Sequence, residues 1–210
     1  MLGPIRHGED RALATIDYYC FPLSVFSYFA GMRLEEIAAR HGAEITYKPV
    51  ELPRIFAETG TPPVKDRHES RRRYRLQDIA RLAGTTGLPV NPQPRHWPTN
   101  AVPACVAVIT AQNAGGGDVG ALLHGLLRAV WAEERDIAED AVIRDCLTAA
   151  GFDPGLADRG MLTGVETLQR NTDEALARMV FGAPSYVVGE EVFWGQDRLA
   201  HLDAHLAGLG

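Results

Sequence analysis

Near the amino end, two short β-prone runs flank a stretch of apolar residues at helical spacing. The first run is Thr-Ile-Asp-Tyr-Tyr-Cys at residues 15–20, and the second covers residues 43–49. Between them, Ser24 stands where a helix N-cap is expected, and apolar residues then recur every three or four positions to about His41. This pattern predicts a β-α-β unit with parallel strands and a right-handed crossover.

The middle of the chain has helical periodicity, which glycine- and proline-containing loops interrupt. The predicted helices lie at residues 69–86, 99–113, 119–133, 139–150 and 165–181. We therefore expect residues 61–180 to form a helical insertion domain.

The pattern returns to β-structure near the carboxyl end. Residues 185–188 and 191–193 are typical of two strands joined by a tight turn, and a final helix starts near Gln196. The order β-α-β, helical block, β-β-α predicts an α/β fold of the thioredoxin type with a large all-helical insertion. Residues 14–60 and 181–210 would form its discontinuous thioredoxin-like domain, and residues 1–13 a polar leader.

The charge of the chain narrows the possible partners. The 210 residues carry a formal net charge of −6, which argues against a general affinity for nucleic acid. No apolar run is long enough to span a bilayer, and residues 1–14 lack the pattern of a signal peptide. We therefore expect a cytoplasmic protein with neither a membrane nor a nucleic acid as its partner.

The three cysteines, Cys20, Cys105 and Cys146, are far apart and odd in number, so they predict no disulfide framework. They form no CxxC pair, and we expect them to be buried or half-buried apolar residues. His201 and His205 have i, i+4 spacing, but no third ligand is evident. No metal site is therefore predicted.

Ser24 is the first candidate for chemistry. Backbone N–H groups and the helix dipole favour an anion at the amino end of a helix. In thioredoxin-like redox proteins this position holds the first cysteine of CxxC, but here the four residues are Ser-Val-Phe-Ser. A serine cannot exchange disulfides, although its hydroxyl can donate a hydrogen bond to a bound thiolate. Ser24 can also be a simple N-cap, and the two roles do not exclude each other.

The segment around the last two strands carries further candidates. Pro184 comes just before a strand and is expected to follow a cis bond, which would leave the N–H and C=O of Ala183 free to pair with an extended peptide. Residues 194–197, Trp-Gly-Gln-Asp, lead into the last helix, where backbone N–H groups can hold a carboxylate. Asp197 could hold an ammonium group or could be an ordinary acidic residue at a helix start.

Two segments are basic, although the net charge of the chain is negative. The arginines between residues 67 and 75 form either a solvated face or a grip for a carboxylated ligand. The loop at residues 94–100, Pro-Arg-His-Trp-Pro-Thr-Asn, is either simple packing or a lid over a flat substrate.

Together these segments resemble the 2-hydroxychromene-2-carboxylate isomerases, relatives of the kappa-class glutathione transferases within the DsbA-like thioredoxin group. The similarity covers residues 15–207, and its carboxyl-terminal motif is specific to the family. The matching segments are Asp17-Tyr18-Tyr19, Leu23-Ser24, Phe26-Ser27-Tyr28, Tyr74, Asp78, Arg81, Gly87-Leu88-Pro89, Pro94 to Asn100, Phe181 to Pro184 and Phe193 to Leu199.

The resemblance implies a glutathione-dependent cis-trans isomerase that acts on a small aromatic carboxylate, an intermediate of aromatic-compound degradation, by reversible thiol addition. It implies that Ser24 is the catalytic residue and contacts the glutathione sulfur, that Arg67 and Trp97 contact the substrate, and that the protein is a homodimer. The residues implied to bind glutathione are Ser24, Ala183, Pro184, Trp194, Gly195, Gln196 and Asp197.

The chain departs from the family pattern on the substrate side. Val25 replaces the usual proline after the serine, and Phe56 falls where the family has a substrate-contacting lysine. The exact substrate therefore stays open. Two alternative functions also stay open: a kappa-like glutathione transferase, which releases the adduct, and a redox-inactive DsbA-like protein that binds thiols or peptides without turnover.

Overall fold

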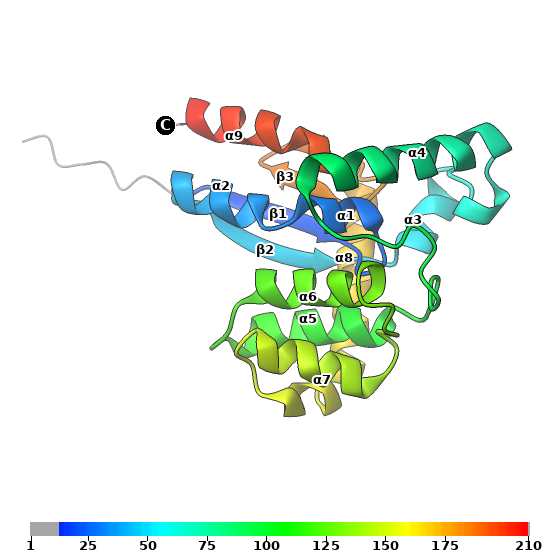
Figure 1. The fold of residues 1–210 in the computed structure, drawn as a ribbon. Coiled ribbons are helices and arrows are strands. Elements are labelled where there is room, and N and C mark those ends of the chain that lie inside the picture. The colour runs from blue at the N-terminus through cyan, green and yellow to red at the C-terminus, as the bar shows by residue number, and fades with distance from the viewer. Residues whose placement is uncertain (1–12, 210) are drawn as a thin grey trace, which may run out of the picture.

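A four-stranded mixed sheet is the centre of the molecule in the computed structural model, which describes residues 13–209 (Figure 1). Strand β1 (Thr15–Cys20) pairs in parallel with β2 (Glu44–Pro49) and antiparallel with β3 (Ser185–Val188), and β3 pairs with β4 (Glu191–Trp194). The order is therefore β2-β1-β3-β4. The predicted thioredoxin-like fold is confirmed, whereas almost all of the predicted leader lies outside the described residues.

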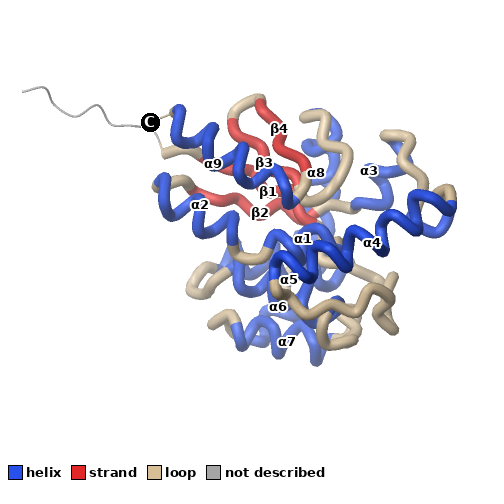
Figure 2. Tube along the Cα trace, turned by 45° about the horizontal axis from the view of Figure 1, so that its top comes forward, coloured by secondary structure: helices blue, strands red, loops and turns tan. Residues whose placement is uncertain are grey.

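Each face of the sheet packs against its own helices. Side chains alternate along β1, so Tyr18 belongs to the larger apolar core and Tyr19 to the smaller one on the opposite face. The larger core includes side chains of α1 (Val25–Ala30), α2 (Arg33–His41) and α9 (Leu199–Gly208), and the smaller core includes those of α3 (Leu52–Glu58) and α8 (Met161–Ala177). Figure 2 shows the strands bordered by helices on both sides.

The first helical stretch differs from the prediction. The single helix expected to end near His41 is divided into α1 and α2, because Gly31 takes a left-handed conformation with φ of 58°. Helix α3 was not predicted. It follows β2 directly, is seven residues long and has Pro53 in its first turn, so it presents too little apolar periodicity to be recognised.

The predicted helices of the middle segment are present. They are α4 (Glu69–Thr86), α5 (Val102–Ala114), α6 (Val119–Trp131), α7 (Asp140–Ala149) and α8. Short 3₁₀ turns lie before α4, at Val64–Asp66, and between α7 and α8, at Pro154–Asp158. Helix α8 begins and ends about four residues earlier than predicted, since it starts after the left-handed Gly160 and stops before Met179, whose φ is 60°. None of the described helices is both long and apolar enough to cross a membrane.

The helical segment and the sheet share one core. Helices α5, α6 and α7 lie together beside the sheet, and α4 extends past it (Figure 1). Buried side chains of α5, α6 and α7 belong to the same cluster as Tyr18 and Phe29. The division into a thioredoxin-like domain and an insertion domain stays a prediction.

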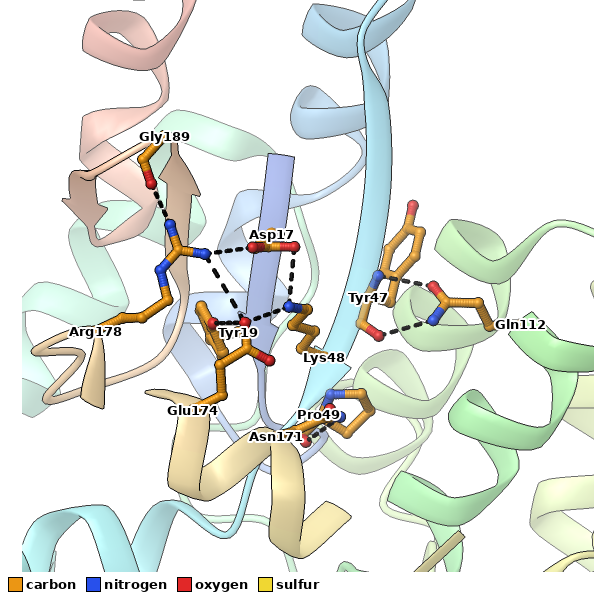
Figure 3. Close-up of polar contacts among 10 residues, drawn as sticks. All are labelled: Asp17, Tyr19, Tyr47, Lys48, Pro49, Gln112, Asn171, Glu174, Arg178 and Gly189. Atoms are coloured by element: carbon orange, nitrogen blue, oxygen red, sulfur yellow. Dashed lines mark hydrogen bonds and ion pairs between the residues drawn. The ribbon is translucent and has the colours of Figure 1, made fainter. Parts of the chain in front are cut away.

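A side chain from the helical segment covers the outer edge of strand β2. Gln112 of α5 accepts a hydrogen bond from the Tyr47 N–H at 2.7 Å and donates one to the Tyr47 carbonyl at 3.1 Å (Figure 3). Farther along, Asn171 of α8 donates to the Pro49 carbonyl at 3.2 Å. These amides take the place of a further strand, because they satisfy backbone groups that an edge strand leaves unpaired.

A charged network attaches α8 to the face of the sheet on which Tyr19 lies (Figure 3). Lys48 lies 3.1 Å from a carboxylate oxygen of Asp17 and 2.6 Å from one of Glu174. Tyr19 donates to Glu174 at 3.0 Å, and Arg178 pairs with Asp17 at 2.6 Å and donates to the Gly189 carbonyl. Two cations and two carboxylates thus balance one another between β1, β2 and α8.

Candidate active site

Ser24 lies where β1 leads into α1 and caps that helix. Its hydroxyl oxygen accepts a hydrogen bond from the Ser27 N–H at 3.2 Å, and its side chain is buried. The same hydroxyl donates to the carbonyl of Ala183 at 3.0 Å, across 159 positions of sequence. The antiparallel pairing of β1 with β3 brings these two loops together.

The helix after Ser24 is shorter than the helix to about His41 that we expected to favour an anion at this position. Helix α1 has six residues, so its dipole can contribute little to holding an anion. The hydroxyl of Ser24 is therefore the group with which this loop can form a hydrogen bond to a ligand. With serine at positions 24 and 27, neither of these positions has a thiol for disulfide exchange.

The cis-proline loop, residues 182–184, lies directly opposite Ser24. The Ala183–Pro184 bond is cis, as predicted. The Ala183 carbonyl is not free, however, because Ser24 donates to it, whereas no hydrogen bond from the Ala183 N–H is found within residues 13–209. Ser185 donates to the Gly182 carbonyl at 2.8 Å and holds the loop against the start of β3.

Aromatic rings cover one side of the cis-proline loop. The ring of Trp194, at the end of β4, packs edge-on against Phe181 with centroids 4.7 Å apart. Both side chains are about half exposed. A methyl group on Gly182 would overlap the Trp194 indole nitrogen, so only glycine allows this close approach.

The turn after β4 places the remaining predicted residues beside the same loop. Gly195 has φ of 107° and donates its N–H to the Pro184 carbonyl at 2.9 Å. Gln196 and Asp197 follow in a 3₁₀ turn before α9, and Arg33 donates to the Gln196 carbonyl at 3.2 Å. The carboxylate of Asp197 is exposed and pairs with neighbouring Arg198 at 2.7 Å. The structure thus brings Ser24, Ala183, Pro184 and residues 194–197 together.

Trp97 joins the Ser24 loop to the basic segment. Its indole N–H donates to the Leu23 carbonyl at 3.1 Å, one residue before Ser24. The guanidinium of Arg75 lies over the same ring at 5.1 Å from the centroid and over Trp131 at 5.6 Å. Trp97 therefore lies beside the candidate site, and its contact with the substrate stays a prediction.

Arg67 makes different contacts. It donates to the Pro62 carbonyl at 3.0 Å and covers the Phe56 ring at 5.4 Å. Burial, together with the nearby charge of Arg71, lowers its pKa. Arg67 does not line the pocket next to Trp97.

That pocket has a volume of about 330 Å³ and is lined by Lys65, Arg72 and Arg75 together with apolar groups, among them Leu76, Pro94 and Trp97. Sequence reasoning included Arg72 and Arg75 only as members of a basic run and missed Lys65. Positions 72, 75 and 76 are spaced i, i+3, i+4 on one helix face, which is the signal that could have singled them out.

The cysteines and the paired histidines lie outside this site's chemistry. All three cysteines are buried, as predicted, and burial raises the pKa of each thiol, that of Cys146 to about 11. His205 pairs with Glu191 at 3.0 Å. Within residues 13–209, no group of three or more metal-ligand side chains is present.

Comparison with known proteins supports the expected family. A family model described as the DSBA-like thioredoxin domain matches residues 15–207. The 2-hydroxychromene-2-carboxylate isomerase of Pseudomonas putida is 27% identical over 199 residues, which cover 92% of this chain and 95% of that protein. The protein of the same name from Sphingobium xenophagum is 26% identical, covering 91% and 97%.

The solved structures agree with the sequence comparisons. A 2-hydroxychromene-2-carboxylate isomerase structure matches with a TM-score of 0.78 and 26% identity over 93% of this chain and 95% of that one. The cytosolic disulfide reductase DsbM of Pseudomonas aeruginosa matches with a TM-score of 0.66 at 20% identity, over 92% and 98%, and shares the fold. The resemblance to 2-hydroxychromene-2-carboxylate isomerases is thus confirmed.

Proposed function

Because this chain belongs to the family of DSBA-like thioredoxin domains, we propose that it is an isomerase of the 2-hydroxychromene-2-carboxylate isomerase type that uses glutathione as its cofactor. Relatives that carry this enzyme's name align over nine-tenths of the chain, which supports the isomerase class. The observation that carries the proposal is the buried hydrogen bond between Ser24 and Ala183. It puts a hydroxyl, in place of a redox thiol, against the cis-proline loop.

The residues of the site fit glutathione. A tripeptide with an extended backbone can pair with the Ala183 N–H, which has no other partner in the described part of the chain. Gly182 and Gly195 have no side chain that could block a peptide from the backbone of this loop. A methyl group on Gly195 would also come 2.5 Å from an Asp197 oxygen. The exposed carboxylate of Asp197 is suited to an ammonium group such as that of the γ-glutamyl residue.

Bound glutathione would supply a nucleophilic thiolate for reversible addition to a conjugated double bond. Ser24 would donate its hydroxyl hydrogen to the sulfur and so favour the ionised form. A serine hydroxyl has one hydrogen, which in this structure goes to the Ala183 carbonyl. Ser24 must therefore release that carbonyl before it can donate to sulfur.

The substrate side of the site is the pocket beside Trp97. Its aromatic wall suits a flat ring, and the Arg75 guanidinium can bind a carboxylate through two parallel hydrogen bonds. Trp97 also donates a hydrogen bond to the Leu23 carbonyl, next to Ser24. The substrate would therefore lie on one side of Ser24 and the cofactor on the other. Orientation of the two reactants is then the main task of the protein.

The test is the absorbance change of 2-hydroxychromene-2-carboxylate with the purified protein, with and without glutathione. We expect conversion only with glutathione, and a loss of about 100-fold in turnover for Ser24→Ala while glutathione still binds. Ser70→Ala, which removes an exposed hydroxyl on α4, is the control and should keep full turnover.

The other outcomes separate the alternatives. Conjugation of an electrophile without isomerisation would replace the proposal with a glutathione transferase, and binding without either reaction would replace it with a non-catalytic thiol-binding protein. Unchanged turnover in Ser24→Ala would remove Ser24 from the chemistry.

A further inference from the structure

The pocket beside Trp97 holds more positive charge than a single carboxylate can balance. Its volume of about 330 Å³ lies within the usual range for sites of small molecules, and three of its lining residues are cations, Lys65, Arg72 and Arg75. Among residues 13–209, no aspartate or glutamate lines it. In a chain with 27 acidic and 21 basic residues, this local excess is the reverse of the overall balance.

The surrounding acids do not neutralise these cations. Among residues 13–209, none of the three is in an ion pair with a carboxylate, although other arginines, such as Arg54 and Arg144, are paired. Cations that line one pocket without a carboxylate partner attract an anion into it. The arrangement thus favours an anionic ligand over water.

Arg75 is held in place for one acidic group. It lies over the rings of Trp97 and Trp131, which fix the plane of its guanidinium. Burial and the nearby charge of Arg67 lower its pKa to about 10, so Arg75 stays charged at neutral pH. Its two-pronged geometry matches one carboxylate.

Lys65 and Arg72 remain after Arg75 is matched. Both line the same pocket and both are exposed, so they lie nearer its mouth than the half-buried Arg75. On the basis of the proposed function, we infer that the acceptor of this enzyme carries two acidic groups on a flat ring, one held by Arg75 and the other by Lys65 and Arg72. An aromatic dicarboxylate is the simplest molecule of this class.

Calorimetric titration of the whole protein with benzoate and with isophthalate, without glutathione, tests the inference. We expect isophthalate to bind at least about tenfold more tightly than benzoate, because its second carboxylate gains charge-assisted hydrogen bonds. Arg72→Gln and Lys65→Gln should each reduce this preference to about threefold or less and leave benzoate affinity within about twofold. Arg75→Gln should weaken both ligands.

Arg73→Gln is the matched control, because Arg73 is an exposed neighbour on the same helix that does not line the pocket. It should keep the preference for isophthalate, which separates a local site from general attraction to a basic helix. Thermal melts of each variant show whether it is folded.

Equal affinity for benzoate and isophthalate would overturn the inference, and so would a preference that survives both Arg72→Gln and Lys65→Gln. These titrations contain neither glutathione nor a reaction. Failure of the Ser24→Ala test would therefore leave the binding result intact, and loss of the isophthalate preference would leave the isomerase proposal intact.

Discussion

At the scale of single residues, Gly195 sets how closely a cofactor can approach the cis-proline loop. Its φ of 107° is strained for any other residue, and a methyl group would come 2.5 Å from the Asp197 carboxylate. We expect Gly195→Ala to weaken glutathione binding at least about tenfold, because both the turn and Asp197 must move. Calorimetric titration with glutathione measures the effect.

Gly189 provides the control for that change. It also has a positive φ, 58°, but no atom of the described residues lies within 4 Å of where its side chain would start. Gly189→Asn should keep glutathione affinity, since asparagine tolerates this left-handed conformation. Equal affinities in all three proteins would mean that the turn after β4 does not contact the cofactor.

Trp97 has two separable contacts, and Trp97→Phe removes only one of them. The ring under Arg75 remains, but the hydrogen bond to the Leu23 carbonyl is lost. We expect turnover to fall about tenfold while KM changes less than about threefold, because the loop that carries Ser24 is less well positioned. Steady-state kinetics of the isomerase reaction measures the two constants separately.

Trp131→Phe is the matched comparison. It also leaves a ring under Arg75, but the Trp131 indole nitrogen has no hydrogen-bond partner in the described part of the chain. Turnover should therefore fall much less than in Trp97→Phe. A similar loss in both variants would show that packing, and not the Leu23 contact, controls the site.

Some of these residues were predictable and others were not. Ser24 and Pro184 could be identified because a helix cap and a proline before a strand are local features. The pocket could not, because Trp97 and Arg75 are 22 positions apart and meet only when the loop after α4 folds back over that helix. Arg67, which the resemblance implied as a substrate contact, lies over Phe56 and does not line that pocket.

At the scale of secondary-structure elements, Gln112 joins α5 to the edge of β2. Gln112→Leu removes two hydrogen bonds and leaves the N–H and C=O of Tyr47, a buried residue, without their partner. We expect a loss of about 2 kcal/mol in the free energy of unfolding. Urea denaturation followed by circular dichroism measures it.

Gln77→Leu, on exposed α4, makes the same chemical change without those contacts and should alter stability by less than about 0.5 kcal/mol. If the two variants were equally stable, water would be serving the β2 edge as well as Gln112 does.

The elements were more predictable than their ends. The long helix α4 was placed correctly, because a loop with glycine and proline marks its end. The break at Gly31 and the short α3 were not, because a single left-handed glycine and a seven-residue helix leave little periodicity to read.

At the scale of the whole molecule, the charged network around Glu174 makes the free energy of unfolding depend on pH, because it attaches α8 to the sheet through an ionised carboxylate. Burial alone would raise the pKa of Glu174, but hydrogen bonds from Lys48 and Tyr19 outweigh it and hold the pKa below its ordinary value of 4.5. Stability from this carboxylate is therefore present above about pH 4.5 and is lost as pH falls through the lower, folded-state pKa.

We expect Glu174→Gln to lower the free energy of unfolding at pH 7 by about 1 kcal/mol, a modest figure because the carboxylate is partly exposed. The difference from the unmodified protein should shrink below pH 4.5, where Glu174 itself becomes protonated. Glu166→Gln, exposed on the same helix, serves as control and should show neither effect. A constant difference at all pH values would contradict the ionic origin of the contribution.

The amide of Gln112 also limits how this protein can be divided. Residues 14–60 joined directly to residues 181–210 would contain every strand of the sheet but would lose the side chains that cap the edge of β2. That edge would then be a template on which other chains could add strands, and the larger apolar core would lie open to water. Such a minimal thioredoxin should aggregate. The helical insertion therefore prevents other chains from pairing with the β2 edge, and it also forms a wall of the pocket.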